Sequence, residues 1–266
     1  MKFRLTILIL LLFAASARPQ RTDLAFGDNE KLEFVVSYRA RLIPNTEVAD
    51  VVVTTSREGD IFTITGHGRC RPFFRWFFDL DDRYTTVMDA TSLRPISASA
   101  RIREGKYAFN SDLLFDWSAM VVHSTYRNLK RADNSYKTMP ITNNSVDGVS
   151  LFYRLRNTDV STLRVGAKMP LELVLEDTIR TLSYTLLGRE EVSVPGLGRF
   201  RSLKFSCQIV TSQGESFPDG SEFFVWISDD RNRIPLLIES PIKVGSVRAR
   251  LARFSGLRHP VESMVH

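Results

Sequence analysis

The residues of this 266-residue chain that could support metal or nucleophilic chemistry are few and far apart. The histidines lack the i, i+4 spacing of a helical zinc site; they are His67, His123, His259 and His266. Only two cysteines are present, with no Cys/His spacing typical of a structural zinc. Ser150 has Gly148 before it but Phe152 after it, so the nucleophile elbow is absent, as are phosphate-loop and dinucleotide motifs. The sequence therefore predicts no catalytic residue, no cofactor and no metal.

Carboxylates do occur in close groups, which is the pattern that a glycosidase would need across a cleft. These groups are Asp79/Asp81/Asp82, Glu190/Glu191 and Asp229/Asp230. All three fall at expected turns or strand ends, where Asp side chains hydrogen-bond their own backbone. No spaced ligand loop for calcium accompanies them. Turn formation is therefore the favoured interpretation, and an enzyme acting on envelope polymers is a minor alternative.

An arginine-flanked aromatic segment at residues 69–80, RCRPFFRWFFDL, is the most suggestive local feature. Pro72 suits the first turn of a helix, so we expect a short helical segment at about 72–79. One interpretation is a capping helix whose aromatic side chains fill the end of a sheet. The other is an apolar lip that meets acyl chains and anionic head groups. Large exposed apolar patches are rare on monomers, which favours the capping interpretation. The candidate contact residues are Arg71, Phe73, Phe74, Arg75, Trp76 and Phe77.

Most of the remaining chain alternates between apolar and polar residues, which is the period-2 pattern of half-buried strands. Residues 96–102 and 182–186 are clear examples. Tyr107, Phe109, Leu113 and Phe115 share one side of another such segment. Residues 146–156 have helical spacing instead, with Asn144 or Ser145 as the expected cap.

About a dozen short strands rarely form a flat sheet, because strand twist makes large sheets curl or close. The sequence therefore predicts a mainly β fold. We expect a single large antiparallel, strongly curved sheet or incomplete barrel, with one main helix at about 146–156. That helix would lie against the concave side or across the mouth.

The two cysteines, Cys70 and Cys207, could form a disulfide if the protein is exported. Cys207 shares a strand face with Leu203 and Phe205, which is typical of a small buried apolar residue. Both possibilities stay open, because spacing in sequence says nothing about disulfide geometry.

The first residues have the composition of a secretory signal peptide. Lys2 and Arg4 precede a short apolar run, and Ala15-Ser16-Ala17 offers small residues for cleavage. The run is shorter than the ~20 residues of a membrane span, and no later stretch is apolar enough to span. We expect a signal peptide at 1–17, a flexible leader at 18–28, one β domain at 29–255 and a frayed tail at 256–266. The net charge of +6 includes Lys2 and Arg4 and would be +4 without residues 1–17. So mild a charge suits contact with anionic head groups or polysaccharide, but solubility alone is the favoured interpretation.

Residues 222–251, hereafter the signature stretch, resemble an exported bacterial family catalogued only as a domain of unknown function. The resemblance rests on a tryptophan-containing strand, a Ser-Asp-Asp turn, an Asn-x-Ile-Pro step and a Glu-x-Pro-Ile-x-Val-Gly-Ser-Val segment. In this sequence they are Trp226, Ser228-Asp229-Asp230, Asn232-Arg233-Ile234-Pro235 and Glu239 to Val247. The resemblance implies export and an antiparallel fold, and it brings no catalytic residues.

Together these features predict an exported, non-enzymatic envelope protein, periplasmic or associated with the outer membrane. We expect it to bind an apolar or amphipathic ligand, lipid or lipoprotein-like, in the concavity of its sheet. Trp226 and the aromatic segment are the candidate contacts. The alternative is a structural or assembly component that docks an envelope protein through the aromatic segment or an edge strand near Pro235. Nucleic acid is not an expected partner.

Overall fold

The computed structural model describes residues 23–41, 43–76, 79–130, 134–209, 222–242 and 245–265. The expected signal peptide at 1–17, the first part of the leader and the candidate residue Phe77 lie outside the described residues. Within them, the chain forms one 16-stranded sheet, one α-helix and two short 3-10 helices.

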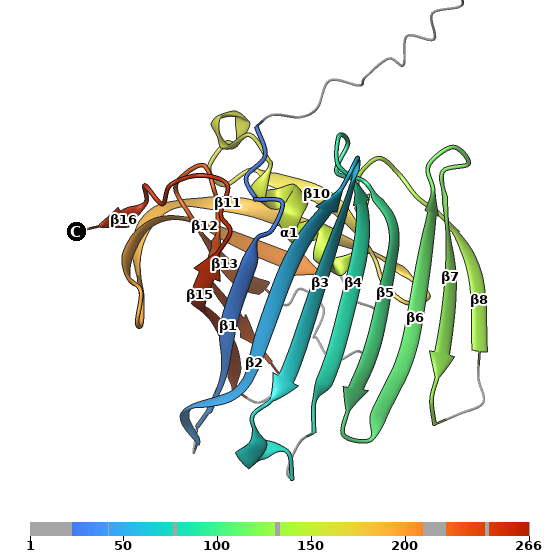
Figure 1. The fold of residues 1–266 in the computed structure, drawn as a ribbon, viewed down its shortest axis with the longest axis horizontal. Helices are drawn as coiled ribbons and strands as arrows, with labels where there is room; N and C mark the ends of the chain where they lie inside the picture. Colours follow the sequence, from blue (N-terminus) through green and yellow to red (C-terminus); the bar gives the residue numbers. More distant parts are fainter. Residues whose placement is uncertain are drawn as a thin grey trace, which may run out of the picture.

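The first half of the sheet is an antiparallel meander in chain order, which forms the front wall in Figure 1. Its strands are β1 (Lys31–Ala40), β2 (Ile43–Glu58), β3 (Ile61–Cys70), β4 (Asp81–Asp89), β5 (Pro95–Glu104), β6 (Tyr107–Asp116), β7 (Val121–Asn128) and β8 (Asn134–Pro140). The 3-10 helix η1 (Pro72–Phe74) lies in the connection from β3 to β4. Neighbouring strands joined by short turns are the arrangement that the alternating sequence favours.

The second half runs back across the rear of the molecule (Figure 1). Its strands are β9 (Ser145–Val146), β10 (Lys168–Val174), β11 (Ile179–Val194), β12 (Gly198–Ile209), β13 (Glu222–Ser228), β14 (Pro235–Pro241), β15 (Ser246–Ser255) and β16 (Met264–Val265). β15 pairs with β1 and so joins the two halves, while β16 pairs with β12. The predicted single antiparallel sheet is confirmed, apart from a two-residue parallel pairing of β9 with β10.

The sheet curves strongly but does not close by strand pairing, because β8 and β9 end the strand order. Its two ends are held together by side chains instead. Ser124 on β7 donates to the carbonyl of Glu176 in the β10–β11 turn. Lys137 on β8 contacts Asp177 in the same turn, with 3.0 Å between Nζ and Oδ2. The predicted incomplete barrel is therefore confirmed.

The helix α1 (Gly148–Arg156) starts two residues later than the sequence pattern predicts, and its cap is a different residue. Val146 pairs with Leu173 as part of β9, which keeps it out of the helix. Asp147 is the N-cap, and its carboxylate accepts from the backbone N–H groups of Val149 and Ser150. Asn144 and Ser145 therefore do not cap it. A second 3-10 helix, η2 (Val160–Thr162), follows.

α1 lies inside the curve of the sheet, between the front wall and the rear strands (Figure 1). Its Tyr153 packs on the front wall in a cluster with Phe62 and Met88, and its hydroxyl is 2.8 Å from that of Thr55. Its Leu151 packs on the rear wall with residues of β10–β13. The helix thus buries apolar groups on both sides and serves as the core of the half-barrel.

The expected flexible leader and frayed tail are wrong for the residues that the structure describes. Leu24 and Phe26 are buried beside Tyr153, so this part of the leader belongs to the core. The tail is held by the side chain of Asn232, which bonds the backbone of His259 in both directions. Leader and tail also meet at Gly27, where a Cβ would lie 2.1 Å from the carbonyl of Gly256. The polar composition of the leader and the tail predicted mobile ends, but contacts with residues far away in the sequence hold both segments in place.

A buried ion pair joins the end of α1 to the leader. Arg156 and Glu30 are 2% and 1% exposed and form two hydrogen bonds of 2.6 and 2.8 Å. The remaining donors of the guanidinium reach the carbonyls of Ala25 and Asn232. Every strong donor on this buried cation therefore has a partner, as a desolvated charge requires.

Breaking this pair on one side should destabilise the fold strongly, because it leaves an uncompensated buried charge. We expect Arg156→Met or Glu30→Met to lower the free energy of unfolding by about 3–5 kcal/mol, and the double variant to cost less than the sum. Urea denaturation followed by tryptophan fluorescence measures this. Arg253→Met, which breaks the exposed pair with Glu33, is the matched control and should cost below about 1 kcal/mol. If the buried and the exposed variants lost the same free energy of unfolding, this account would be contradicted.

Candidate functional site

The aromatic segment does not form the capping helix that the sequence favours. Only η1 is helical, and Phe73 and Trp76 are 74% and 80% exposed. The rings stay outside because the chain turns away from the sheet directly after β3, at Arg71. Arg71 is held by Asp50 and Glu47 of β2. Phe73 and Trp76 therefore do not fill the end of the sheet, as the capping interpretation expects, and their rings are exposed.

Trp226 and the two cysteines are separate from this segment. Trp226 is 7% exposed, donates to the carboxylate of Glu190, and has the ammonium of Lys204 4.8 Å from its ring centroid. It lies on the strand face opposite Val225 and Ile227, which pack toward α1, so it does not line the concavity. Cys70 and Cys207 are both free and buried, with five strands between β3 and β12 in the sheet order. The proposed disulfide is therefore not formed.

The signature stretch has a structural role in this chain. The carboxylate of Asp230 accepts from the backbone of Asn232 and Arg233 and from the hydroxyls of Ser228 and Ser263. Asn232 in turn holds the tail and offers its carbonyl to Arg156, as described above. The acidic turn thus satisfies backbone groups, as the sequence favoured over catalysis.

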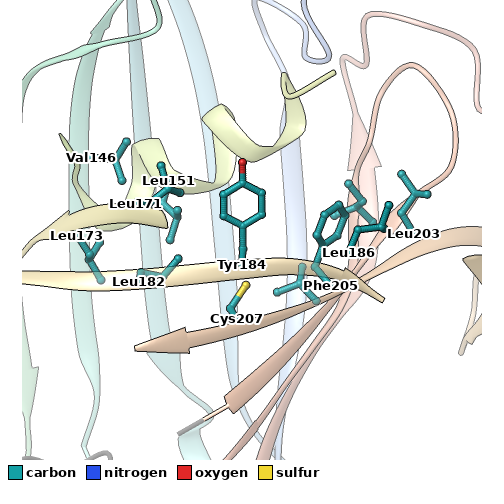
Figure 2. Packing of buried hydrophobic residues seen from close by; sticks show 12 residues of the cluster. Val146, Leu151, Leu171, Leu173, Leu182, Tyr184, Leu186, Leu203, Phe205 and Cys207 are labelled. Atoms are coloured by element: carbon teal, nitrogen blue, oxygen red, sulfur yellow. The ribbon is translucent and has the colours of Figure 1, made fainter. Parts of the chain in front are cut away.

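The centre of the concavity is filled by α1 and the side chains beneath it. Figure 2 shows Tyr184 on β11 with its hydroxyl directed at the helix, Cys207 at its base and leucines on either side. One gap between the helix and the rear strands has a volume of about 10 Å³, roughly room for a single water molecule. Its lining is apolar apart from Arg156: Phe152, Leu155, Arg156, Phe205, Val225, Ile227 and Pro235. This gap is too small for a ligand larger than water.

Beyond the helix, strand register defines what else lies on the concave face. Thr86 of β4 marks that face, because its hydroxyl donates to the α1 cap residue Asp147 at 2.7 Å. Tyr84 is two residues away on the same strand and therefore shares the face. Across the sheet Tyr84 pairs with Ala100, Ala100 with Ser111, and Ser111 with Tyr126. Because residues directly opposite one another share a face of the sheet, Ser111 and Tyr126 also lie on the concave face.

The next row of the concave face is aromatic as well. Phe109 precedes Ser111 by two residues, and its ring centroid is 5.3 Å from that of Tyr126 and 5.2 Å from that of Tyr107. Tyr126 also lies close enough to Tyr107 to raise its pKa. We call Tyr84, Tyr107, Phe109 and Tyr126 the tyrosine floor. They come from three strands that only the sheet register brings together.

The tyrosine floor is surrounded by protein and yet accessible. Burial is the largest cause that raises the pKa of both Tyr84 and Tyr107 above the usual range. Their side chains nevertheless keep substantial contact with solvent, since the two residues are 41% and 50% exposed. An aromatic ring that is both crowded by protein and open to solvent is typical of the wall of a concave surface.

Carboxyl groups border one end of the floor. Asp82 lies two residues before Tyr84, and Glu104 pairs directly with Tyr107. The two carboxyls lie close enough for each to affect the pKa of the other. Burial, followed by the neighbouring Asp82, raises the pKa of Glu104 to about 7, and burial also raises the pKa of Asp82. Glu176 lies close enough to raise the pKa of both tyrosines further. The surface thus offers aromatic rings beside a carboxyl, Glu104, whose pKa is about 7.

Sequence analysis missed this floor. Alternation placed Tyr107 and Phe109 on one side of a strand, but nothing in the sequence said which side is concave. Asp82 belongs to the acidic group assigned to turn formation, and it does accept from the backbone N–H of Arg103 at 2.9 Å. Its second role beside Glu104 depends on the pairing of β4 with β5, which the local sequence does not reveal.

The fold and the floor together define an open, β-barrel-like protein whose concave face is partly filled by its own helix. Over residues 33–252 the chain matches the family described as a protein of unknown function, DUF3108. The chain therefore belongs to the DUF3108 family.

Among solved structures, the chain is similar to a β-barrel-like protein from Brucella abortus that belongs to another domain of unknown function, DUF1849. The two are 11% identical with a TM-score of 0.59, over 87% of this chain and 98% of that one. At this identity the likeness shows the fold alone. No curated protein matches the chain.

Among the described residues there is neither a membrane-spanning helix nor a candidate metal site. No helix among them is long and apolar enough to cross a membrane. Nor does any group of three or more His, Cys, Asp or Glu side chains in the described ranges have an arrangement that could hold a metal ion.

The cysteine environments predict slow thiol chemistry. Burial raises the pKa of the Cys207 thiol to about 12 and also raises that of Cys70. Because the thiolate is the reactive form, we expect native protein to react slowly with a thiol reagent at pH 8. Two free thiols should react per chain after denaturation without reductant. A denatured chain with no reactive thiol would show that the bond forms after all.

The carboxyl pair predicts a pH-dependent stability that Glu104→Gln removes. The folded pKa of Glu104 lies above its ordinary value of 4.5, so the folded state holds this proton more tightly. Stability from this source is complete below about 4.5 and is lost as pH rises to about 7. Chemical denaturation at several pH values measures the free energy of unfolding of both proteins. Relative to wild type, the free energy of unfolding of the variant should rise across this window by on the order of 1 kcal/mol after solvent screening. A constant difference between the two proteins from pH 4.5 to 8 would contradict the assignment.

Proposed function

We propose that this protein is an exported, non-enzymatic envelope protein that binds an amphipathic ligand against its tyrosine floor. The observation that carries the proposal is the solvent exposure of Tyr84 and Tyr107 on the concave face. Rings in that position can cover the apolar body of a ligand, since each aromatic side chain offers a large apolar surface.

The polar groups around the floor support an amphipathic ligand over a purely apolar one. The hydroxyls of Tyr84 and Tyr107 and the carboxyl of Glu104 would lose contact with water under a wholly apolar ligand, at a cost in free energy. A ligand with a polar end can satisfy them while its apolar part lies on the rings. The helix α1 restricts such a ligand to the β4–β7 side of the concave face.

Export and the absence of catalysis belong to the same proposal. The composition of residues 1–17 supports export to the periplasm or the outer-membrane region. For catalysis, Asp82 and Glu104 lie next to each other at one end of the floor, whereas glycosidase carboxyls stand about 5 Å or more apart on either side of a substrate. Binding without turnover is therefore the function that these residues support best.

The alternative of a structural or assembly component has lost one of its two proposed docking surfaces. Pro235 begins β14, and β14 lies between β13 and β15, so it offers no free edge for another chain. The aromatic segment remains as the surface through which a partner protein could dock.

The proposal is tested by substitutions on the floor with a matched control. Titration of wild-type protein with a fluorescent fatty acid and a fluorescent monoacylglycerol should show saturable binding of at least one probe. Tyr84→Ser with Tyr107→Ser should weaken that binding by roughly tenfold or more, because each lost ring removes about 1 kcal/mol or more of apolar contact. Tyr136→Ser removes an even more exposed ring from the convex face of β8 and should leave binding unchanged.

Native mass spectrometry of protein purified from its own envelope supplies the natural ligand. We expect an additional mass that the floor variant lacks. A clean apo mass, together with no uptake of either probe, would refute ligand binding.

A further inference from the structure

Ligand binding on the tyrosine floor gives no role to the exposed rings of Phe73 and Trp76. Their exposed fractions of 74% and 80% are the highest among the exposed large hydrophobic residues of the described chain. They lie in and directly after η1, which projects beyond the strand ends at the lower rim of the front wall in Figure 1. Water contact over two large rings is unfavourable, so an apolar environment would stabilise them.

The base of this projection is fixed, which keeps the two rings directed outward. Arg71 is bound through its guanidinium to Asp50 and Glu47, and through its backbone N–H to the carbonyl of Val48 at 2.9 Å. The backbone N–H of Phe74 donates to Arg71, and the ring of Phe74 packs edge-on against Phe73 at 5.1 Å. The rings are therefore presented by a built turn with few conformations to lose on binding.

The charges around the projection favour an uncharged or zwitterionic partner. Each arginine nearby has a carboxylate within 4 Å: Arg71 has Asp50 and Glu47, Arg75 has Asp79, and Arg69 and Arg83 share Asp81. Arg250 also binds Glu47, so five arginines share four carboxylates and only a single excess positive charge remains to attract an anionic surface. Electrostatic attraction to acidic lipid or nucleic acid is correspondingly weak.

The size of the apolar surface favours a lipid interface over a folded protein. Two aromatic side chains bury about 150–250 Å² each, whereas a stable protein interface buries about 800 Å² on each partner. A lipid surface needs no such area, and large aromatic residues concentrate at the boundary between head groups and acyl chains.

We propose that Phe73 and Trp76 insert into the interface of a zwitterionic lipid bilayer and dock the protein on it. The connection to the floor is direct, because Leu80 pairs with Glu104, and the backbone N–H of Gly105 donates to the carbonyl of Asp79 at 2.7 Å. Docking would therefore hold the Glu104–Tyr107 end of the floor near the lipid surface. The inference stands on the exposed rings and does not depend on ligand binding.

The test is flotation of the purified full chain with phosphatidylcholine vesicles at 0.05 and 0.5 M salt. We expect wild-type protein to float with the vesicles equally well at both salt concentrations, because apolar insertion is not screened. Phe73→Ser with Trp76→Ser should lower the partition coefficient by at least tenfold. Tyr136→Ser, which removes another highly exposed ring far along the sheet on β8, should partition as wild type does. Thermal unfolding of each variant checks that the fold is kept.

Several results would overturn the proposal. Wild-type protein that stays unbound with phosphatidylcholine vesicles, or a double variant that floats as well as wild type, would each refute it. Binding that requires anionic lipid and disappears at 0.5 M salt would show electrostatic docking instead. Loss of membrane binding with floor binding intact, or the reverse, separates this proposal from the one on ligand binding.

Discussion

The buried pair of Arg156 and Glu30 is the interaction on which the arrangement of this protein depends. It joins the last turn of α1 to the leader, and Arg156 also takes the carbonyl of Asn232 from the β13–β14 turn. Three segments more than 70 residues apart in the chain thus meet at one cation. Because a buried charge must be fully hydrogen-bonded, the pair tolerates one arrangement of these segments. The position of α1 inside the sheet follows from it.

The position of α1 decides which part of the concave face can be used. A half-barrel of this size without a helix would expose a continuous apolar trough. Here α1 fills the centre with its own side chains, and the β4–β7 side keeps the exposed rings of Tyr84 and Tyr107. The apolar core and the proposed binding surface are thereby separated in space, since the core lies under the helix and the mixed aromatic and acidic surface lies beyond it. The signature stretch supports the core and takes no part in the floor.

Much of the architecture could be predicted from local pattern. Alternation in segments such as residues 96–102 gave antiparallel strands, and helical spacing at 146–156 gave the one main helix. The errors were at the ends and at the exposed aromatic segment. Leu24 and Phe26 look like part of a polar leader, yet both are buried against Tyr153. Phe73 and Trp76 look like core residues, yet both face solvent. In each case the outcome depends on how segments far apart in the sequence are arranged in the fold.

The sequence by itself determined that the chain forms one large antiparallel sheet with a single long helix, and that its signature stretch marks its family. Those properties depend on side-chain period and on local turn chemistry, which neighbouring residues carry. Only the tertiary structure decided which strand faces are concave, where α1 lies, and that Asp82 and Glu104 lie close together near Tyr107. Period-2 alternation assigns residues to a common face, but what covers that face depends on the curvature of the whole sheet.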